Sequence, residues 1–269
     1  MKFFRSRARR TKPSPVFRLA ELYHAGQYAE AEKEGRALIR SPLSESELVV
    51  AWTVVAISVG AQGRHAEAVS AYEKALAVSH DFYGAEHWQT LKLRSDRAQQ
   101  LAAGGRHAEC EAECEAVVRA AAGAADEDKR LVALAATNGL VYALNKRGQH
   151  VKAEALARDA LATPGETHRG HVTLQLGLAR SLNGQARHEE ALAEAERADE
   201  LRSALPEAHR RPEAGAVHVM AATALLELGR LTEARTRADA GHTACLASFG
   251  PDHHRTVEAR ELLARIDAA

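Results

Sequence analysis

Histidine and cysteine are the residue types here that could bind a metal, and four histidines recur at regular places. His65, His107, His150 and His188 each occupy the same position of a phrase that returns along the chain. Neighbouring members therefore lie about one repeat apart, too far for ligation of one metal ion. We expect these histidines to pack within a repeated turn.

Two of the three cysteines, Cys110 and Cys114, are four residues apart and would share one face of a helix. They suit either buried packing or a redox or metal-binding pair, and we favour packing. An odd total of three argues against a disulfide framework and favours a reducing compartment. We therefore expect a cytoplasmic protein.

Other chemical signals are weak. His168, His171, His253 and His254 lie in expected loops without a cysteine or carboxylate cluster of metal-binding spacing. We find no glycine-rich phosphate loop, no nucleophile elbow and no His-Glu-x-x-His motif. We expect no catalytic residues, no metal and no cofactor.

The charge balance gives no electrostatic reason for a nucleic-acid or membrane partner. Lys plus Arg and Asp plus Glu both number 36. Basic residues gather at the start, between Lys2 and Lys12, which we interpret as a flexible tail over residues 1–14; the alternative is an arm for nucleic acid or anionic lipid. We expect neither a secretory signal nor a membrane span.

An internal repeat is the strongest pattern in the chain. The phrase Gly63-Arg64-His65-Ala66-Glu67-Ala68 returns from Gly105 and from Gly148, with weaker copies from Gly26, Ala186 and Gly229. The intervals between the leading residues are 37, 42, 43, 38 and 43. Periods in this range are typical of a solenoid.

Each interval predicts two helices joined at the repeated turn. Apolar residues fall at helical spacing on both sides of Gly63, and only 4% of all residues are aromatic. Ser44 with Glu47 forms a capping-box pattern, and Asp126 begins another helix. Small residues stand where two helices must approach closely: Ala56, Ala98, Ala179 and Ala222 on first helices, and Ala68, Ala153, Ala191 and Ala234 on second helices. We place prolines 42, 164, 206, 212 and 251 between helices.

The chain resembles the tetratricopeptide-repeat family. The second unit matches the family pattern best, and the third departs from it at Arg94, Arg97 and Cys110. The longer period and the phrases at 83–91 and 249–257 resemble the kinesin light chain subtype, which is common also in bacterial proteins. The matching positions are Trp52, Val55, Ala56, Gly63, His65, Ala68, Tyr72 and Ala75.

This resemblance implies an all-α fold, a right-handed alpha-alpha superhelix over residues 15–269. We expect six helix-turn-helix repeats and a capping helix at about 254–267. Val257, Leu262, Leu263 and Ile266 would cover the sixth pair, and Glu258, Arg260, Glu261 and Arg265 would form a polar outer face. First helices would line the concave side.

The family's groove-facing positions give a candidate binding surface on the first helices. Asn side chains can pair with a peptide backbone, and Lys146 and Arg180, which lack an acidic neighbour on the same helix face, can bind a carboxylate. The alternative is that these are ordinary solvated helix faces. The candidate residues are Gln99, Asn138, Tyr142, Asn145, Lys146, Arg180, Asn183 and Thr223.

Non-catalytic binding of a partner is the function this fold favours. Our first hypothesis is a scaffold that holds another protein or an extended peptide, anchored by an acidic side chain or a C-terminal carboxylate. The alternative is a regulatory sensor in which a peptide changes the superhelix curvature and switches a partner. Self-association is a third hypothesis.

Overall fold

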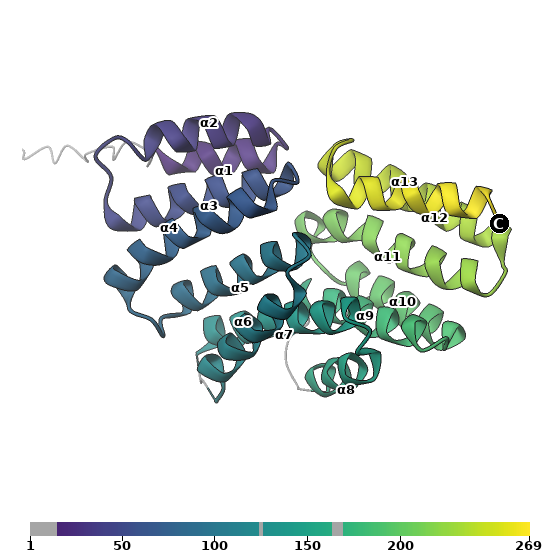
Figure 1. The fold of residues 1–269 in the computed structure, drawn as a ribbon. Coiled ribbons are helices and arrows are strands. Elements are labelled where there is room, and N and C mark those ends of the chain that lie inside the picture. Colours follow the sequence, from purple (N-terminus) through teal and green to yellow (C-terminus); the bar gives the residue numbers. More distant parts are fainter. Residues whose placement is uncertain (1–14, 124–125, 163–168) are drawn as a thin grey trace, which may run out of the picture.

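The computed structural model describes residues 15–123, 126–162 and 169–269, apart from the side chains at 208, 209, 211 and 212. Thirteen helices and no strand occur in this described part of the chain (Figure 1). They form six pairs and a final single helix, as predicted. The pairs are α1 (Val16–His24) with α2 (Tyr28–Leu38), α3 (Glu45–Ala61) with α4 (His65–Tyr83), α5 (Trp88–Ala103) with α6 (His107–Ala121), α7 (Glu127–Lys146) with α8 (His150–Leu161), α9 (Arg169–Gly184) with α10 (His188–Ser203) and α11 (Glu207–Glu227) with α12 (Leu231–Phe249), and α13 (His254–Asp267) follows them.

The repeated phrase builds the same helix end in all six pairs. Gly63 has φ +79°, its N–H donates to the Gly60 carbonyl, and the Arg64 N–H donates to the Val59 carbonyl. These two backbone hydrogen bonds form a Schellman motif, which needs a residue in the left-handed conformation just after the helix. In the fifth pair that residue is Ala186, with φ +57° and the same two bonds. The left-handed position therefore explains why glycine recurs there.

Helix starts also follow the local sequence. Ser44 and Glu47 form the expected capping box at α3, and the Asp126 carboxylate accepts from the Asp128 N–H at 3.0 Å at the start of α7. The interpretation of Pro212 was wrong: α11 begins at Glu207, directly after Pro206, and includes position 212. Proline there removes one backbone donor near the helix start, and α11 continues because its following turns pack against α10 and α12. Pro164 lies outside the described residues.

Alanines form the closest contacts between the paired helices. All eight alanines singled out in the sequence are 0% exposed. Larger residues fill the space around them, including Tyr72 at 1% exposure. Small side chains at such contacts allow two helix axes to approach closely.

Arg94 and Arg97 of α5 depart from the repeat pattern because they share one carboxylate. Glu113 of α6 lies 2.8 Å from the Arg94 guanidinium and 3.1 Å from that of Arg97. The three side chains are all less than one-third exposed. This pairing makes two arginines acceptable on a partly buried face of the third unit.

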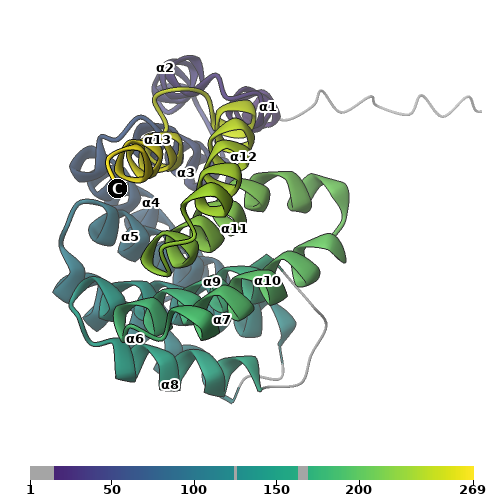
Figure 2. The ribbon, with the colours of Figure 1, turned by 90° about the vertical axis from the view of Figure 1, so that its right-hand side faces the viewer.

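First helices contact one another from α5 to α13, and α1 contacts α3, whereas second helices contact mainly first helices. The principal contacts include α5 with α7, α7 with α9, α9 with α11 and α11 with α13. The first helices therefore lie on the inner, shorter side of the curve, and the stack bends around them (Figure 2). This arrangement confirms that first helices line the concave side.

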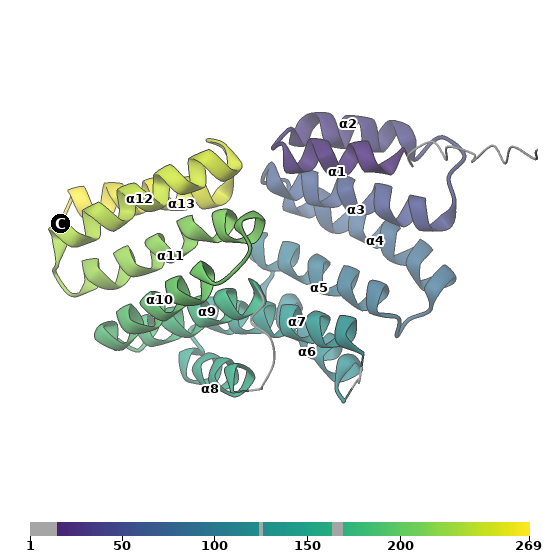
Figure 3. The ribbon, with the colours of Figure 1, turned by 180° about the vertical axis from the view of Figure 1, so that it is seen from behind.

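The curve brings the two ends of the described chain together. Figures 1 and 3 show α1–α3 beside the turn that leads into α13. The rings of Tyr28, at the start of α2, and His253, before α13, are 6.5 Å apart between centroids. The repeats thus complete a turn in which the first pair meets the last helix.

Candidate functional site: the concave groove

Tyr142 is the centre of the candidate site on the concave side. Its ring lies on α7, with the Lys146 ammonium 5.5 Å and the Arg180 guanidinium 5.3 Å from its centroid. The edge of the His107 ring packs against it at 6.3 Å. Burial raises the pKa of Tyr142, and the nearby Arg180 charge opposes this effect. The arrangement fixes two cations from adjacent first helices around one aromatic ring.

Arg180 has a carboxylate partner that its own helix does not supply. The Glu258 carboxylate of α13 lies 3.9 Å from the guanidinium, at the outer limit for an ion pair. The Arg180 side chain is 33% exposed and that of Glu258 is 52% exposed. The sequence has no acidic residue at helical spacing from Arg180 on α9. The winding of the solenoid instead places the Glu258 carboxylate, 78 positions later in the chain, beside Arg180.

Next to Arg180, a cavity of about 300 Å³ opens between α9, α11 and α13. Three predicted site residues share it: Arg180, Asn183 and Thr223. Met220 and Leu262 give it an apolar part, since both are largely buried. The lining consists of Arg180, Asn183, Val219, Met220, Thr223, Glu258, Glu261, Leu262 and Arg265.

α13 is therefore both a cap and a wall of this cavity. Leu262 and Ile266 are buried against the preceding helices, as expected for a cap. Glu258, Glu261 and Arg265 were expected on an outer polar face, and they are exposed, but they line the cavity. Sequence reasoning missed them because the pattern of α13 alone does not show which way the solenoid curves.

Asn145 is buried within the solenoid and is not exposed to the groove. It is 6% exposed, and its amide N–H group donates to the Gly177 carbonyl at 3.2 Å and to the Ser181 hydroxyl at 3.0 Å. Its amide oxygen faces His150 Nδ1 at 2.9 Å. All these partners belong to the solenoid, so we leave Asn145 out of the binding surface proposed below.

Of the other predicted residues, Asn138 and Gln99 lie outside the cavity, and Thr223 lines it. Asn138 is half-buried and donates to the Gly170 carbonyl at 3.0 Å, and its amide oxygen is buried without a hydrogen-bond partner. The Thr223 hydroxyl donates to the Val219 carbonyl of its own helix. Gln99 is exposed on α5 and does not line the cavity. The structure thus brings together Tyr142, Lys146, Arg180, Asn183 and Thr223.

Three of the four recurring histidines, each at the start of a second helix, hydrogen-bond an amide side chain. His188 Nδ1 lies 3.1 Å from the Asn183 amide oxygen, which repeats the pairing of His150 with Asn145. His65 uses Gln100, from the next pair, at 3.0 Å. In the third pair the place of Asn145 is taken by Ala102, and His107 Nδ1 is buried without a partner. These contacts give the histidines the packing role that the repeat predicted.

Cys110 and Cys114 are both 0% exposed, with their Sγ atoms 3.8 Å apart. Their mutual hydrogen bond and burial raise the pKa of the Cys114 thiol. In the described residues, no group of three or more His, Cys, Asp or Glu is placed to hold a metal ion. His168 lies outside these residues.

A second charged cluster, formed by Arg169, Glu213 and Arg255, was not predicted from the sequence. Glu213 of α11 is only 1% exposed and accepts a hydrogen bond from Arg169 at the start of α9. Arg255 of α13 lies 3.6 Å from the same carboxylate. These residues are 44 and 42 positions from Glu213, so only the assembled solenoid shows the cluster.

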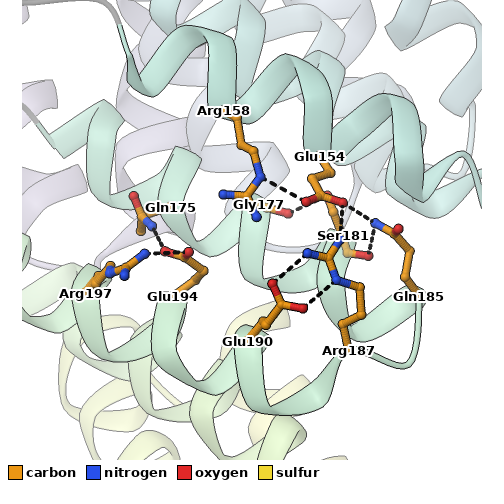
Figure 4. Close-up of polar contacts among 10 residues, drawn as sticks. All are labelled: Glu154, Arg158, Gln175, Gly177, Ser181, Gln185, Arg187, Glu190, Glu194 and Arg197. Carbon is orange, nitrogen blue, oxygen red and sulfur yellow. Dashed lines mark hydrogen bonds and ion pairs between the residues drawn. The ribbon is translucent and has the colours of Figure 1, made fainter.

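Away from the groove, ion pairs join neighbouring repeats through their second helices. Figure 4 shows the Glu154 carboxylate of α8 surrounded by Arg158, Gln185 and Arg187, with Arg187 also bound to Glu190. Burial alone would raise the pKa of Glu154, but these hydrogen bonds and charges lower it. The network links α8 to the turn between α9 and α10.

A separate group in Figure 4 involves the buried Glu194 of α10. Its carboxylate accepts hydrogen bonds from Gln175 of α9 and from Arg197. The polar groups in this part of the molecule therefore satisfy one another.

Comparisons with known proteins agree with this architecture. No protein-family model and no curated protein matches the chain. Among solved structures, NprR in complex with its cognate peptide NprX has a TM-score of 0.67 at 14% identity, over 93% of this chain and 71% of that one. PlcR of Bacillus thuringiensis, in complex with the peptide PapR7 and DNA, has a TM-score of 0.57 at 12% identity, over 94% and 96%.

A putative kinesin light chain from Podosopora anserina, with nearly identical TPR-like repeats, has a TM-score of 0.55 at 22% identity. The match covers 71% of this chain and 94% of that one. The chain therefore has the fold of tetratricopeptide-repeat proteins, with repeats like those of kinesin light chains. No helix in the described part is both long and apolar enough to cross a membrane.

Proposed function

We propose that this chain is a non-catalytic interaction module that binds an extended segment of another protein, or a peptide, along its concave side. The observation that carries the proposal is the pair of cations held on Tyr142 beside the cavity of about 300 Å³. The fold similarity to NprR and PlcR, whose structures contain bound peptides, supports it. A fold alone does not define a partner, so the site chemistry must define the ligand.

A carboxylate is the ligand group that this site suits best. The Lys146 and Arg180 cations lie 5.5 and 5.3 Å from the centroid of the same Tyr142 ring, and charge-assisted hydrogen bonds to a carboxylate are the strong ones. Held on the ring, they lose less side-chain freedom on binding than two mobile surface cations would. The carboxylate belongs to an acidic side chain or to the C-terminus of the ligand.

The surface of the proposed groove includes polar side chains on both sides of this pair. Asn183 and Thr223 line the cavity next to Arg180, where a side chain of the ligand has space to enter. Gln99 on α5, and Asn138 on α7, the helix that also carries Lys146, extend the surface toward the N-terminal repeats. An extended segment along the inner side would meet these residues in succession.

Replacing Lys146 and Arg180 together by Ala tests the proposal. We expect the double variant to bind its partner about 2–4 kcal/mol more weakly, because charge-assisted contacts are lost, while its melting temperature stays close to wild type. Proteins captured from the native cell by wild type and variant are compared by quantitative mass spectrometry. The matched control changes Lys152 of α8 and Arg40, both exposed and outside the cavity, to Ala.

If the groove variant captures the same proteins as wild type at the same strength, the partner binds elsewhere and the proposal fails. Loss of capture in the control as well would show that net charge, and not the site, determines binding. Loss in the groove variant alone supports the proposal.

A peptide-sensing regulator is the second candidate, and the contact between Tyr28 and His253 favours it. This contact joins the first pair to the last helix, so a ligand that changes the curvature would change it directly. The sensor and the scaffold share the same groove, and they differ in whether binding moves the ends.

A reducing compartment suits the cysteines. All three cysteines are free and buried, and Cys110 and Cys114 are held as thiols with their sulfur atoms 3.8 Å apart. We therefore place the protein in the cytoplasm as part of this proposal.

A further inference from the structure

The geometry of α13 points to a role for Glu258 in ligand selection: we propose that its carboxylate occupies the cation site of Arg180 and competes with the carboxylate of the ligand. This inference rests on the proposed function, since it concerns the same groove. It assigns the final helix a part in binding, beyond its role as a cap.

The Arg180–Glu258 pair is weak enough to be exchanged. The two charged groups are 3.9 Å apart, and both side chains keep contact with solvent at 33% and 52% exposure. Pairs of this kind contribute little because water screens them and because two long side chains must be held in place. Arg180 is therefore held mainly by the Tyr142 ring, and Glu258 is the part that can leave.

A ligand carboxylate has an advantage that Glu258 lacks. Glu258 reaches Arg180 from the far wall of the cavity, and no ion pair joins Lys146 to a carboxylate in the described part of the chain. A ligand carboxylate beside the Tyr142 ring would be near both cations, since the Lys146 ammonium and the Arg180 guanidinium lie 5.5 and 5.3 Å from the ring centroid.

Competition lowers the apparent affinity without changing the site itself. When Glu258 holds Arg180 for part of the time, the apparent dissociation constant equals the intrinsic one divided by the fraction of sites in which Arg180 is free. Glu258 thus lowers the affinity for acidic ligands and leaves the affinity for neutral ligands unchanged.

The arrangement also predicts which ligands are affected. A ligand with an amide in place of its carboxylate gains nothing when Glu258 is removed, because it does not compete for the Arg180 charge. An acidic ligand gains two- to fivefold, the range expected for a partly exposed pair.

The experiment uses two pools of N-acetylated hexapeptide amides, with Glu fixed at the fourth position in one and Gln in the other. All other positions are random among uncharged residues. Binding of each fluorescent pool to the full chain is measured by anisotropy at fixed ionic strength. The proteins are wild type, Glu258→Gln, Arg180→Ala, the double variant of these two, and Glu196→Gln as control. Glu196 is exposed on α10 outside the cavity, and its change alters the net charge by the same amount.

We expect wild type to bind the Glu pool more tightly than the Gln pool, and Glu258→Gln to bind the Glu pool two- to fivefold more tightly again. The Gln pool and the Glu196→Gln control should show no change. In the Arg180→Ala background, Glu258→Gln should have no effect, because the competed cation is gone; this double-mutant cycle isolates the pair.

The possible failures separate the two proposals. If wild type does not prefer the Glu pool, the acidic-ligand form of the proposed function fails. If wild type prefers it but Glu258→Gln behaves as Glu196→Gln does, only the competition fails. A gain that persists without Arg180 shows general charge repulsion and overturns the assignment of Arg180 as the contested cation.

Discussion

A single backbone position, the second residue after each first helix, determines how every hairpin turns. Five of the six pairs have glycine there, and Ala186 adopts the same left-handed conformation at φ +57°. For an L-residue with a Cβ atom this conformation costs roughly 1 kcal/mol. The fifth turn therefore contains strain that the other five lack.

We predict that Ala186→Gly stabilises the protein by about 0.5–1 kcal/mol, since relief of the left-handed strain outweighs the greater freedom of glycine in the unfolded chain. Chemical denaturation with circular dichroism measures this change. The reciprocal variant Gly148→Ala should be destabilised by a similar amount. Equal stability of Ala186→Gly and wild type would show that the turn relaxes around alanine without cost.

His107 provides a second prediction for one residue. Its Nδ1 atom is buried without a partner, whereas the same atom of His150 faces Asn145 five positions earlier. We predict that Ala102→Asn gives His107 a partner and partly offsets the cost of the added atoms, so that it destabilises less than the near-isosteric Ala102→Leu. Thermal melts of the two variants test this order. A lower melting temperature for Ala102→Asn than for Ala102→Leu contradicts it.

At the scale of helices, the sequence predicted best those features that depend only on residues within the same helix or turn. The Ser44 box, the Asp126 cap and the repeated glycines were predicted because each depends on neighbours within a few residues. The eight alanines were predicted because their period matches the repeat. Pro212 was misplaced because packing of the rest of α11 decides where that helix begins.

Close helix contacts leave no room for larger side chains. We predict that Ala68→Leu and Ala191→Leu each cost about 1–3 kcal/mol through overpacking, since both residues are 0% exposed. Ala29→Leu, at an exposed position of α2, is the control and should change stability by less than about 0.5 kcal/mol. Unchanged melting of both core variants would contradict the helix register.

Glu154 makes the link between α8 and the next repeat depend on pH. Its pKa in the folded protein is lowered by Gln185, Arg158 and Arg187, despite the opposing effect of burial. The stabilisation is complete above the unfolded value of about 4.3 and is lost as the pH falls through the folded pKa. Wild type should therefore lose more stability than Glu154→Gln between pH 6 and pH 3.

Urea denaturation of both proteins across that pH range measures the difference. Glu115→Gln, an exposed carboxylate on α6, is the control and should follow the wild-type curve closely. A constant gap between wild type and Glu154→Gln at every pH would show that the network does not favour the ionised carboxylate.

At the scale of the whole molecule, the winding determines what the sequence could not show. Glu258 and Arg180 are 78 positions apart, and Tyr28 and His253 are 225 apart. Their proximity follows from small rotations between successive pairs, added over the chain. A sequence pattern specifies each helix face but not this sum, and therefore the groove wall formed by α13 and the Arg169–Glu213–Arg255 cluster were missed.

The sensor and the scaffold predict different movements of the ends. Spin labels on Gln27→Cys and Asp252→Cys, both exposed, report the distance between the first pair and the turn before α13, and the three native cysteines are buried. We predict a short, narrow distance distribution without ligand. Addition of the Glu hexapeptide pool should leave it unchanged for a scaffold and shift it for a sensor.

The meeting of Tyr28 and His253 also has a mechanical consequence. Every interface between neighbouring pairs adds its own rotation. The distance between the two ends therefore depends on the sum of these rotations, and a small change at one interface causes a larger displacement at the ends. A buried substitution in the fourth or fifth pair can thus change the distance between the Tyr28 and His253 rings, although it lies far from both and hardly changes the structure around itself. Conversely, a partner that binds both ends at once restricts the curvature of all the repeats between them.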